Sequence, residues 1–374
     1  MKIAVVSRGI PDQKNPMNGI FEFDQAKALA STGNDVVLLI VDLRSIRRFR
    51  HWGISTEKRE NILCHKISIP VGNVPDYLFC IIGAIALRIL YSYAYPSGSR
   101  PDIIHSHFTR QSYMAAVLSK KTNVPLVITE HSSDMNKNII KNSLKKIAKK
   151  AYSSAKTIIA VSSSLAKNIK EKTGFDCVIV PNVVNSSLFF PIINKSKDFF
   201  QFVSVGRLIE RKRMDLLIEA FSEVHKNRPN TKLVIFGSGN METMLRHLIQ
   251  SYKIEDCVEL RGLVDRNEIA KEFQKSNAFV LLSERETFGV AYIEALAAGL
   301  PVIATNCHGP EDFMNDSFGY MIERNNRKQA IDAMIKIYES INSFSPFAIS
   351  KTIKEMYSPE TIARQLVNLY TTII

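Results

Sequence analysis

Short apolar runs alternate with helical patterns along most of the chain, and this alternation limits it to a parallel α/β fold. The run "KIAVVS" (2–7) is typical of a buried strand, "FEFDQAKALASTG" (21–33) has helical spacing, and "DVVLLIV" (35–41) predicts the next strand. Together they make a βαβ unit. Further strands are predicted at 102–108, 125–131 and 157–162. The first half should therefore be a parallel sheet covered by helices on both faces.

The same pattern restarts after a polar, proline-containing connection at 181–198. Strands are predicted at 200–207, 232–239, 257–262, 278–284 and 301–306, with helices between them. A chain of 374 residues exceeds the usual size of a single core, and 45% apolar residues can fill two. We predict two doubly wound, Rossmann-like domains, 1–190 and 191–355, facing each other across a cleft.

Charge and cysteine content narrow the class of partner and the compartment. The 49 Lys and Arg exceed the 36 Asp and Glu by 13, which favours a nucleotide, a phospholipid surface or a nucleic acid. The basic runs lack interleaved aromatic residues, so we expect no nucleic-acid partner, although a basic nucleic-acid-binding protein is the alternative from another class.

Five scattered cysteines, without a Cys-x-x-Cys pair or a signal peptide pattern, predict a reduced cytoplasmic protein.

One apolar segment raises the question of contact with a membrane. Residues 77–95 are nearly all apolar, but Arg88 and several tyrosines interrupt them, and the uninterrupted part is too short to span a bilayer. The segment is either a buried or groove-lining helix or an interfacial helix. Basic runs at 44–52 and 137–156 would help an interfacial helix adhere to anionic lipid.

Several polar residues stand where strands end and helices begin. Arg207 follows one strand and Lys212 precedes the next helix, a placement suited to binding a diphosphate. Gly237 starts a Gly-x-Gly turn, and Gly19 ends the loop before the first helix, where backbone N–H groups could face a phosphate or sugar. His131 ends a strand and would point into the cleft. Each of these features also fits an ordinary surface, turn or structural role.

Two glutamates stand close together in a largely apolar stretch, and one of them is expected to be buried. Glu286 and Glu294 lie on either side of a Phe-Gly step, and Glu294 sits in an otherwise apolar helical pattern. Burying an unpaired charge is costly, so Glu294 needs a polar partner or a wet, functional environment. His105 and His107 have the spacing of two metal ligands, but no nearby carboxylate or cysteine supplies the further ligands that a metal site needs. We predict no metal site.

The order and spacing of these motifs resemble the retaining glycosyltransferases of family 4, which have the GT-B fold. The resemblance rests on "GRLIERKRMDLLIEAF" (206–221), on "VIFGSGN" (234–240) and above all on the block 261–305, which contains the Glu, seven residues, Glu motif. It implies transfer of a sugar from a nucleotide-diphosphate sugar, a UDP- or GDP-sugar, to an acceptor hydroxyl with retention of configuration. A nucleotide-sugar 2-epimerase of the same architecture is the alternative.

By this resemblance, Glu286 binds the donor sugar, Glu294 binds the ribose hydroxyls, and His131 lies near the reacting sugar. Arg207 and Lys212 would stabilise the departing diphosphate, so no metal and no other cofactor should be required. The base would lie against Gly262, Leu263 and Val264, and the diphosphate would meet the N–H groups of Phe288, Gly289 and Val290.

Charge and apolar residues in the first domain suggest a hypothesis for where such an enzyme would work. A basic first domain with the apolar segment 77–95 suits an enzyme that is cytoplasmic or peripheral on the inner membrane face and that glycosylates a lipid-linked, lipopolysaccharide or cell-surface polysaccharide intermediate. By analogy the C-terminal helix, 356–374, should return to the first domain. Departures from the family pattern include Arg213 after Lys212, Asn18 before Gly19, and "CHGPED" (307–312), which affects sugar specificity.

Overall fold

The computed structural model describes residues 1–374 except 13–14, 16, 44–51, 97, 138 and 193–197, and it divides into two compact units. Unit 1 comprises Met1–Val183 and Pro359–Ile374, and unit 2 comprises Val184–Ser358. The division falls before the boundary expected after residue 190, because Phe189 is buried against Phe273 of unit 2. The returning segment begins after residue 356, because Tyr357 packs against Phe288 of unit 2. Most of the basic run 44–52 lies outside the described residues.

Unit 1 is built on a sheet in the order β3-β4-β2-β1-β5-β6-β7-β8. All of its strand pairs are parallel except β3 with β4. The central strands are buried on both faces, which explains the apolar runs of β1 and β2. The strands are β1 (Lys2–Ser7), β2 (Asp35–Asp42), β3 (Gly53–Arg59), β4 (Ile62–Ser68), β5 (Ile103–His107), β6 (Leu126–Glu130), β7 (Thr157–Ala160) and β8 (Val178–Ile179).

The antiparallel hairpin of β3 and β4 is an addition to the predicted parallel sheet. Its first strand is exposed along almost its whole length and has no apolar run to mark it. Glu60 and Asn61 connect the strands with positive φ angles of 46° and 68°, as the central residues of a tight hairpin turn require. The hairpin continues the sheet beyond β2 and leaves the order of the parallel strands unchanged.

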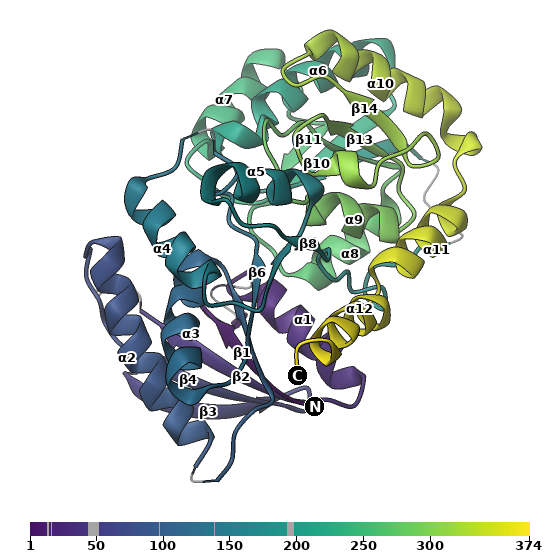
Figure 1. Ribbon diagram of the computed structural model, residues 1–374. Helices are drawn as coiled ribbons and strands as arrows, with labels where there is room; N and C mark the ends of the chain where they lie inside the picture. The colour runs from purple at the N-terminus through teal and green to yellow at the C-terminus, as the bar shows by residue number, and fades with distance from the viewer. Residues whose placement is uncertain (13–14, 16, 44–51, 97, 138, 193–197) are drawn as a thin grey trace. The chain divides into compact units, whose positions relative to one another are not determined.

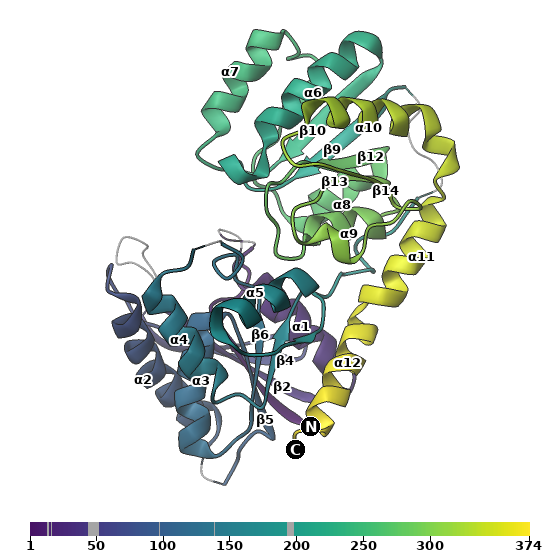
Figure 2. The same ribbon diagram turned by 45° about the horizontal axis from the view of Figure 1, so that its top comes forward.

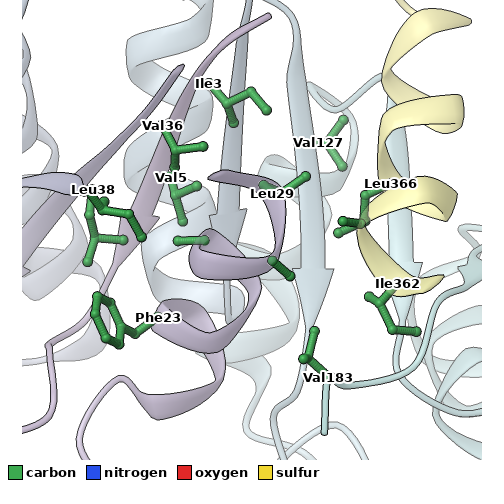
Figure 3. Packing of buried hydrophobic residues seen from close by; sticks show 14 of the residues in the cluster. Ile3, Val5, Phe23, Leu29, Val36, Leu38, Val127, Val183, Ile362 and Leu366 are labelled. Atoms are coloured by element: carbon green, nitrogen blue, oxygen red, sulfur yellow. The ribbon is translucent and has the colours of Figure 1, made fainter. Parts of the chain in front are cut away.

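Helices cover both faces of this sheet (Figures 1 and 2). Helices α2, α3 and α4 pack side by side on one face, while α1 and the C-terminal α12 pack together on the other. Figure 3 shows Leu366 and Ile362 of α12 in one apolar cluster with Leu29 of α1 and Ile3 of β1. The helices of unit 1 are α1 (Ile20–Ser31), α2 (Asp76–Ala94), α3 (Thr109–Thr122), α4 (Asn142–Tyr152), α5 (Ser163–Thr173) and α12 (Pro359–Thr371).

Unit 2 has a wholly parallel sheet in the order β11-β10-β9-β12-β13-β14. Helices α6 and α10 pack together, as do α9 and α11. The strands are β9 (Phe200–Val205), β10 (Thr231–Phe236), β11 (Val258–Leu260), β12 (Ala278–Leu281), β13 (Val302–Thr305) and β14 (Gly319–Ile322). The helices are η1 (Glu210–Lys212), α6 (Met214–Asn227), α7 (Glu242–Tyr252), α8 (Arg266–Lys275), α9 (Val290–Ala297), η2 (Pro310–Asp312), α10 (Arg327–Ser340), η3 (Ile341–Ser343) and α11 (Pro346–Tyr357).

Both sheets are doubly wound, which confirms the predicted fold class. In unit 1 the chain runs outward from β1 through β2 and then returns to β5 on the other side of β1. In unit 2 it runs outward from β9 through β10 and β11 and then returns to β12 on the other side of β9. Ligands of such sheets bind at the carboxyl ends of the two strands where the order reverses. The functional side chains are therefore expected after β1 and β5 and after β9 and β12.

Candidate functional site

In unit 2, an ion pair crosses the point where the strand order reverses. Lys212, the last residue of η1 after β9, pairs through Nζ with Oε1 of Glu286, in the loop after β12. Ser283 donates a hydrogen bond of 2.7 Å to the same carboxylate oxygen. The two side chains are only 13% and 11% exposed. Two of the residues selected from the sequence thus lie together, in a position typical of ligand binding.

Two glycines let neighbouring loops approach closely at this edge of unit 2. A Cβ atom on Gly237 would lie 1.8 Å from the carbonyl oxygen of Gly206, and one on Gly239 would lie 2.1 Å from that of Leu208. Gly237 also donates from its backbone N–H to the carbonyl of Gly262 at 2.8 Å. Any larger side chain at either position would push the loop after β10 away from the loop after β9. Arg207 projects from this second loop with an exposed side chain.

Helix α9 begins beside Glu286. Gly289 caps it with a φ of 96° and contributes no side-chain cap to its first N–H groups. These N–H groups, starting at Val290, offer the partial positive charge that binds anions. The Phe288 side chain is buried against Phe313 and Tyr357, with ring centroids 5.8 and 5.7 Å away, so only its backbone is available to a ligand.

The structure gives Glu294 a protein partner that sequence reasoning missed. Glu294 is buried in α9 and forms an ion pair with Arg266, the first residue of α8. The segment Gly262–Val264 directly precedes α8, and its Leu263 side chain is 54% exposed. No local pattern links Arg266 to a carboxylate twenty-odd positions later in the chain, so only the packing of α8 and α9 reveals the pair.

In unit 1, His131 lies in a cluster of aromatic rings after β6. Its Nε2 atom is 3.0 Å from Nδ1 of His107, and its ring stacks on Phe21 of α1 at 5.8 Å between centroids. Burial lowers the pKa of His131 to about 3, and the nearby Arg8 charge contributes to the lowering. The imidazole is therefore neutral at physiological pH, so it can orient a substrate by hydrogen bonding but cannot act there as a cationic acid.

A buried carboxylate fixes the backbone that carries His131. Glu130 accepts hydrogen bonds from the backbone N–H groups of His131 and Ser132, at 3.1 and 2.8 Å. It also accepts from the hydroxyl groups of Thr109 and Tyr152, at 2.6 and 2.8 Å. All donors converge on one side chain, so the position of His131 depends on α3 and α4 as well as on β6.

Gly19 takes the position expected from the sequence, at the start of the first helix. It caps α1 with a φ of 72°, a conformation that glycine adopts without steric cost. A Cβ atom there would lie 2.1 Å from the carbonyl oxygen of Gly9, so only glycine fits between the loop after β1 and the helix. The residue thereby sets the direction in which α1, with Phe21 in its first turn, leaves this loop.

The histidines at 105 and 107 take part in hydrogen bonding within unit 1. His105 is 2.7 Å from the Thr129 hydroxyl and also contacts the hydroxyl of Tyr370 in α12. Within the described part of the chain, no group of three or more His, Cys, Asp or Glu residues is arranged to hold a metal ion. The cysteines are free thiols.

Comparisons with known proteins give concordant matches over nearly the whole chain. The family model described as Glycosyltransferase Family 4 matches residues 23–188, and that described as Glycosyl transferases group 1 matches residues 186–345. One component of phosphatidylinositol N-acetylglucosaminyltransferase from Arabidopsis thaliana is 25% identical over 276 residues, which are 72% of this chain and 61% of that protein. The chain thus aligns with less than two thirds of that relative.

Two solved structures have a similar fold along their full length. Sucrose-phosphate synthase from Thermosynechococcus elongatus superposes with a TM-score of 0.79 at 20% identity, covering 99% of this chain and 98% of the other. Anabaena HepE in complex with UDP-glucose gives 0.75 at 16% identity, with both chains fully covered. Each unit of the chain is therefore matched by both a family model and a known structure.

Proposed function

The chain belongs to the group 1 glycosyltransferases of family 4, which use nucleotide sugars, and from this premise we propose a retaining, metal-independent transfer of a sugar from UDP- or GDP-sugar to an acceptor hydroxyl. The main support for the proposal is the Lys212–Glu286 ion pair, which lies in unit 2 where the strand order reverses between β9 and β12. The family matches do not favour the 2-epimerase or the nucleic-acid-binding alternative.

Each part of the donor has a suitable group in unit 2. Glu286 accepts hydrogen bonds, as a sugar's hydroxyls require, and its carboxylate is already held by Lys212 and Ser283. The departing diphosphate gains negative charge in the transition state, and Lys212, the exposed Arg207 and the N-terminus of α9 supply positive charge without a metal. Glu294 would accept from the ribose hydroxyls while paired with Arg266. We assign UDP first because HepE was solved with UDP-glucose.

Ligand-dependent stability in the presence of EDTA tests the donor assignment. UDP, GDP, ADP and their sugar conjugates are compared by thermal shift on the native chain and on Glu286→Ala. A nucleotide at 100 times its dissociation constant adds about 2.7 kcal/mol of stability. We expect UDP or GDP to stabilise both proteins, and its sugar conjugate to add further stability only to the native chain. Absence of any shift with every nucleotide would refute a donor site in unit 2.

A surface of unit 1 suits an acceptor carried by an anionic membrane. Helix α2 buries one face against its own unit but exposes an apolar stripe of residues spaced by about one turn. By length and composition α2 could also cross a membrane, and a third of its most apolar window is buried in the unit. The exposed stripe consists of Tyr77, Leu78, Ile81, Ile85, Ile89 and Tyr93.

Basic residues stand next to this apolar stripe. Lys150 of α4 lies over the Tyr77 ring, with Nζ 5.0 Å from its centroid, and further exposed lysines in and beside α4 include Lys146 and Lys149. Apolar side chains flanked by lysines bind anionic lipid through both burial and charge. We infer that unit 1 rests on an anionic membrane and takes a lipid-linked or cell-surface glycan acceptor. The phosphatidylinositol named for the Arabidopsis relative supports a lipid acceptor.

Vesicle sedimentation tests the membrane surface. Ile85→Glu and Ile89→Glu place a charge on the exposed stripe, and we expect each to lower the fraction bound to phosphatidylglycerol vesicles at low salt at least about fivefold, since a buried isoleucine contributes about 1.5–3 kcal/mol. The matched control is Met244→Glu on α7 of unit 2, which is also exposed and should bind as the native chain does. If Ile85→Glu and Ile89→Glu bind the vesicles as strongly as Met244→Glu does, α2 is not part of a membrane-binding surface.

A further inference from the structure

An arginine and an aromatic ring meet at the reversal point of unit 1. Arg8 directly follows β1, and Phe108 directly follows β5, the two strands between which the sheet order reverses. The guanidinium carbon of Arg8 lies 3.8 Å from the centroid of the Phe108 ring. A guanidinium stacked in this way keeps the N–H groups in its plane for other partners.

A buried carboxylate holds one end of the same guanidinium. Nε of Arg8 lies 3.2 Å from Oε1 of Glu22 in the first turn of α1. The Glu22 side chain is completely buried, whereas 39% of the Arg8 side chain remains exposed. Burial raises the pKa of Glu22, and the positive charge of Arg8 opposes that rise. Arg8 is thus held by its Nε end and its flat face while part of it stays open to solvent, which reduces the conformational freedom it would lose on binding a ligand.

The backbone at this point is strained. Phe108 has a φ of 65° and a ψ of 150°, a region that only glycine adopts readily. Such strain persists where surrounding structure enforces it, and it concentrates at binding and catalytic sites. The Phe108 ring also lies 5.0 Å from that of His131. The strained residue therefore places one aromatic ring in contact with both the arginine and the histidine that the family resemblance puts near the reacting sugar.

We propose that Arg8 binds an anionic group, a phosphate or a carboxylate, carried by the acceptor, and that it is a specificity-determining residue for the transfer. This inference rests on the proposed function, because it takes the ligand of unit 1 to be the acceptor. The terminal nitrogens of a guanidinium match two oxygens of such a group in a bidentate contact. The N-terminus of α1, which has no side-chain cap, adds a favourable potential for negative charge.

Anion binding measured by isothermal titration tests the inference, with saturating UDP present to fill the site in unit 2. The probes are sn-glycerol 1-phosphate and L-malate, with uncharged glycerol as the reference. We expect the native chain to bind at least one anion and not glycerol, and Arg8→Gln to weaken that binding about ten- to a hundredfold, the range for a lost hydrogen bond to a charged group. Arg8→Lys keeps the charge but loses the planar guanidinium, so its affinity for the anion should lie between those of the native chain and Arg8→Gln. Arg100→Gln, an exposed arginine elsewhere in unit 1, is the matched control.

A second arm separates a soluble anion from a lipid headgroup. Binding to phosphatidylglycerol vesicles is compared for the native chain, Arg8→Gln and Arg100→Gln. If Arg8→Gln binds a soluble anion more weakly than the native chain does, the inference is supported and the anion is a soluble one. If Arg8→Gln loses binding to the vesicles alone, the inference is supported and the anion is a lipid headgroup. Equal affinities of Arg8→Gln and Arg100→Gln for every probe, or no binding of any anion to the native chain, overturn it. The nucleotide-induced thermal shift depends on unit 2, so a failure of the donor assignment would be seen separately.

Discussion

Replacement of Lys212 by alanine is expected to lower the rate of sugar release from the donor by a factor of about 10²–10³, the usual cost of removing one group that stabilises transition-state charge. Lys212 is the cation paired with Glu286, at the point of unit 2 where ligands of doubly wound sheets bind. The measurement is release of nucleoside diphosphate from the sugar conjugate that stabilises the native chain. A rate close to that of the native chain would exclude Lys212 from the diphosphate site.

The same substitution should also destabilise unit 2, because it leaves the Glu286 carboxylate largely buried without its cation. Breaking a fully buried pair costs about 3–5 kcal/mol; the residual exposure and the hydrogen bond from Ser283 lower our expectation to about 2 kcal/mol. The double variant Lys212→Met with Glu286→Gln carries neither charge of this pair and should recover most of this stability without recovering the rate. That separation would distinguish a functional pair from a structural one.

An exposed ion pair in the same unit is the control for this comparison. Lys226 and Glu223 of α6 lie 3.1 Å apart, with 64% and 40% of their side chains exposed. Exposed pairs contribute little, so Lys226→Ala should change the free energy of unfolding by less than about 0.5 kcal/mol and leave the rate unchanged. A loss of stability as large as that of Lys212→Ala would mean that the two pairs do not differ in burial as the structure indicates.

The regular features of the fold could be predicted because they are local. Buried parallel strands are read in the sequence as apolar runs, so β1 and β2 stand out. Strands β3, β4, β8 and β14 were not predicted; β3 is exposed and has no apolar run, β4 mixes apolar with polar residues, and β8 has only two residues. They lie at or next to the margins of the two sheets, so this omission did not affect the predicted fold class.

The candidate site was predictable only in part, for the same reason. Lys212 and Glu286 are marked by their places after strands and by spacing that resembles a family motif. Arg266, Arg8 and Glu22 belong to no such motif, and their significance lies in the residues they contact across the unit. A sequence pattern can indicate that Glu294 needs a polar partner, but it cannot name Arg266, because the partner is set by the packing of two helices.

The buried histidines of unit 1 are expected to make its stability fall steeply in mild acid. Burial lowers the pKa values of His105 and His131 to about 3 and also holds that of His107 well below its usual range, whereas an unfolded histidine titrates near about 6.5. Between these limits the unfolded chain binds more protons than the folded one. Each histidine should therefore remove about 1.4 kcal/mol of stability per pH unit as the pH falls below about 6.5.

Two buried carboxyl groups act in the opposite direction. Burial raises the pKa values of Glu22 and Glu130 above 4.5, so the folded state takes up their protons first, and this favours folding as the pH falls through the raised values. The three histidines outnumber these two groups, and the histidine contribution begins at the pKa of an unfolded histidine. We therefore expect a net loss of several kcal/mol between about pH 6.5 and pH 4.5.

Substitution of one histidine isolates its contribution from that of the carboxyl groups. In His105→Gln, the slope of unfolding free energy against pH, measured between about pH 6.5 and 4.5 by hydrogen exchange in β5 and β6, should be lower than in the native chain by about 1.4 kcal/mol per pH unit. His247→Gln, at an exposed position of α7 in unit 2, is the control for the substitution itself. An unchanged slope in His105→Gln would mean that His105 is already charged in the folded protein, which its contacts with Thr129 and Tyr370 in a fully buried site argue against.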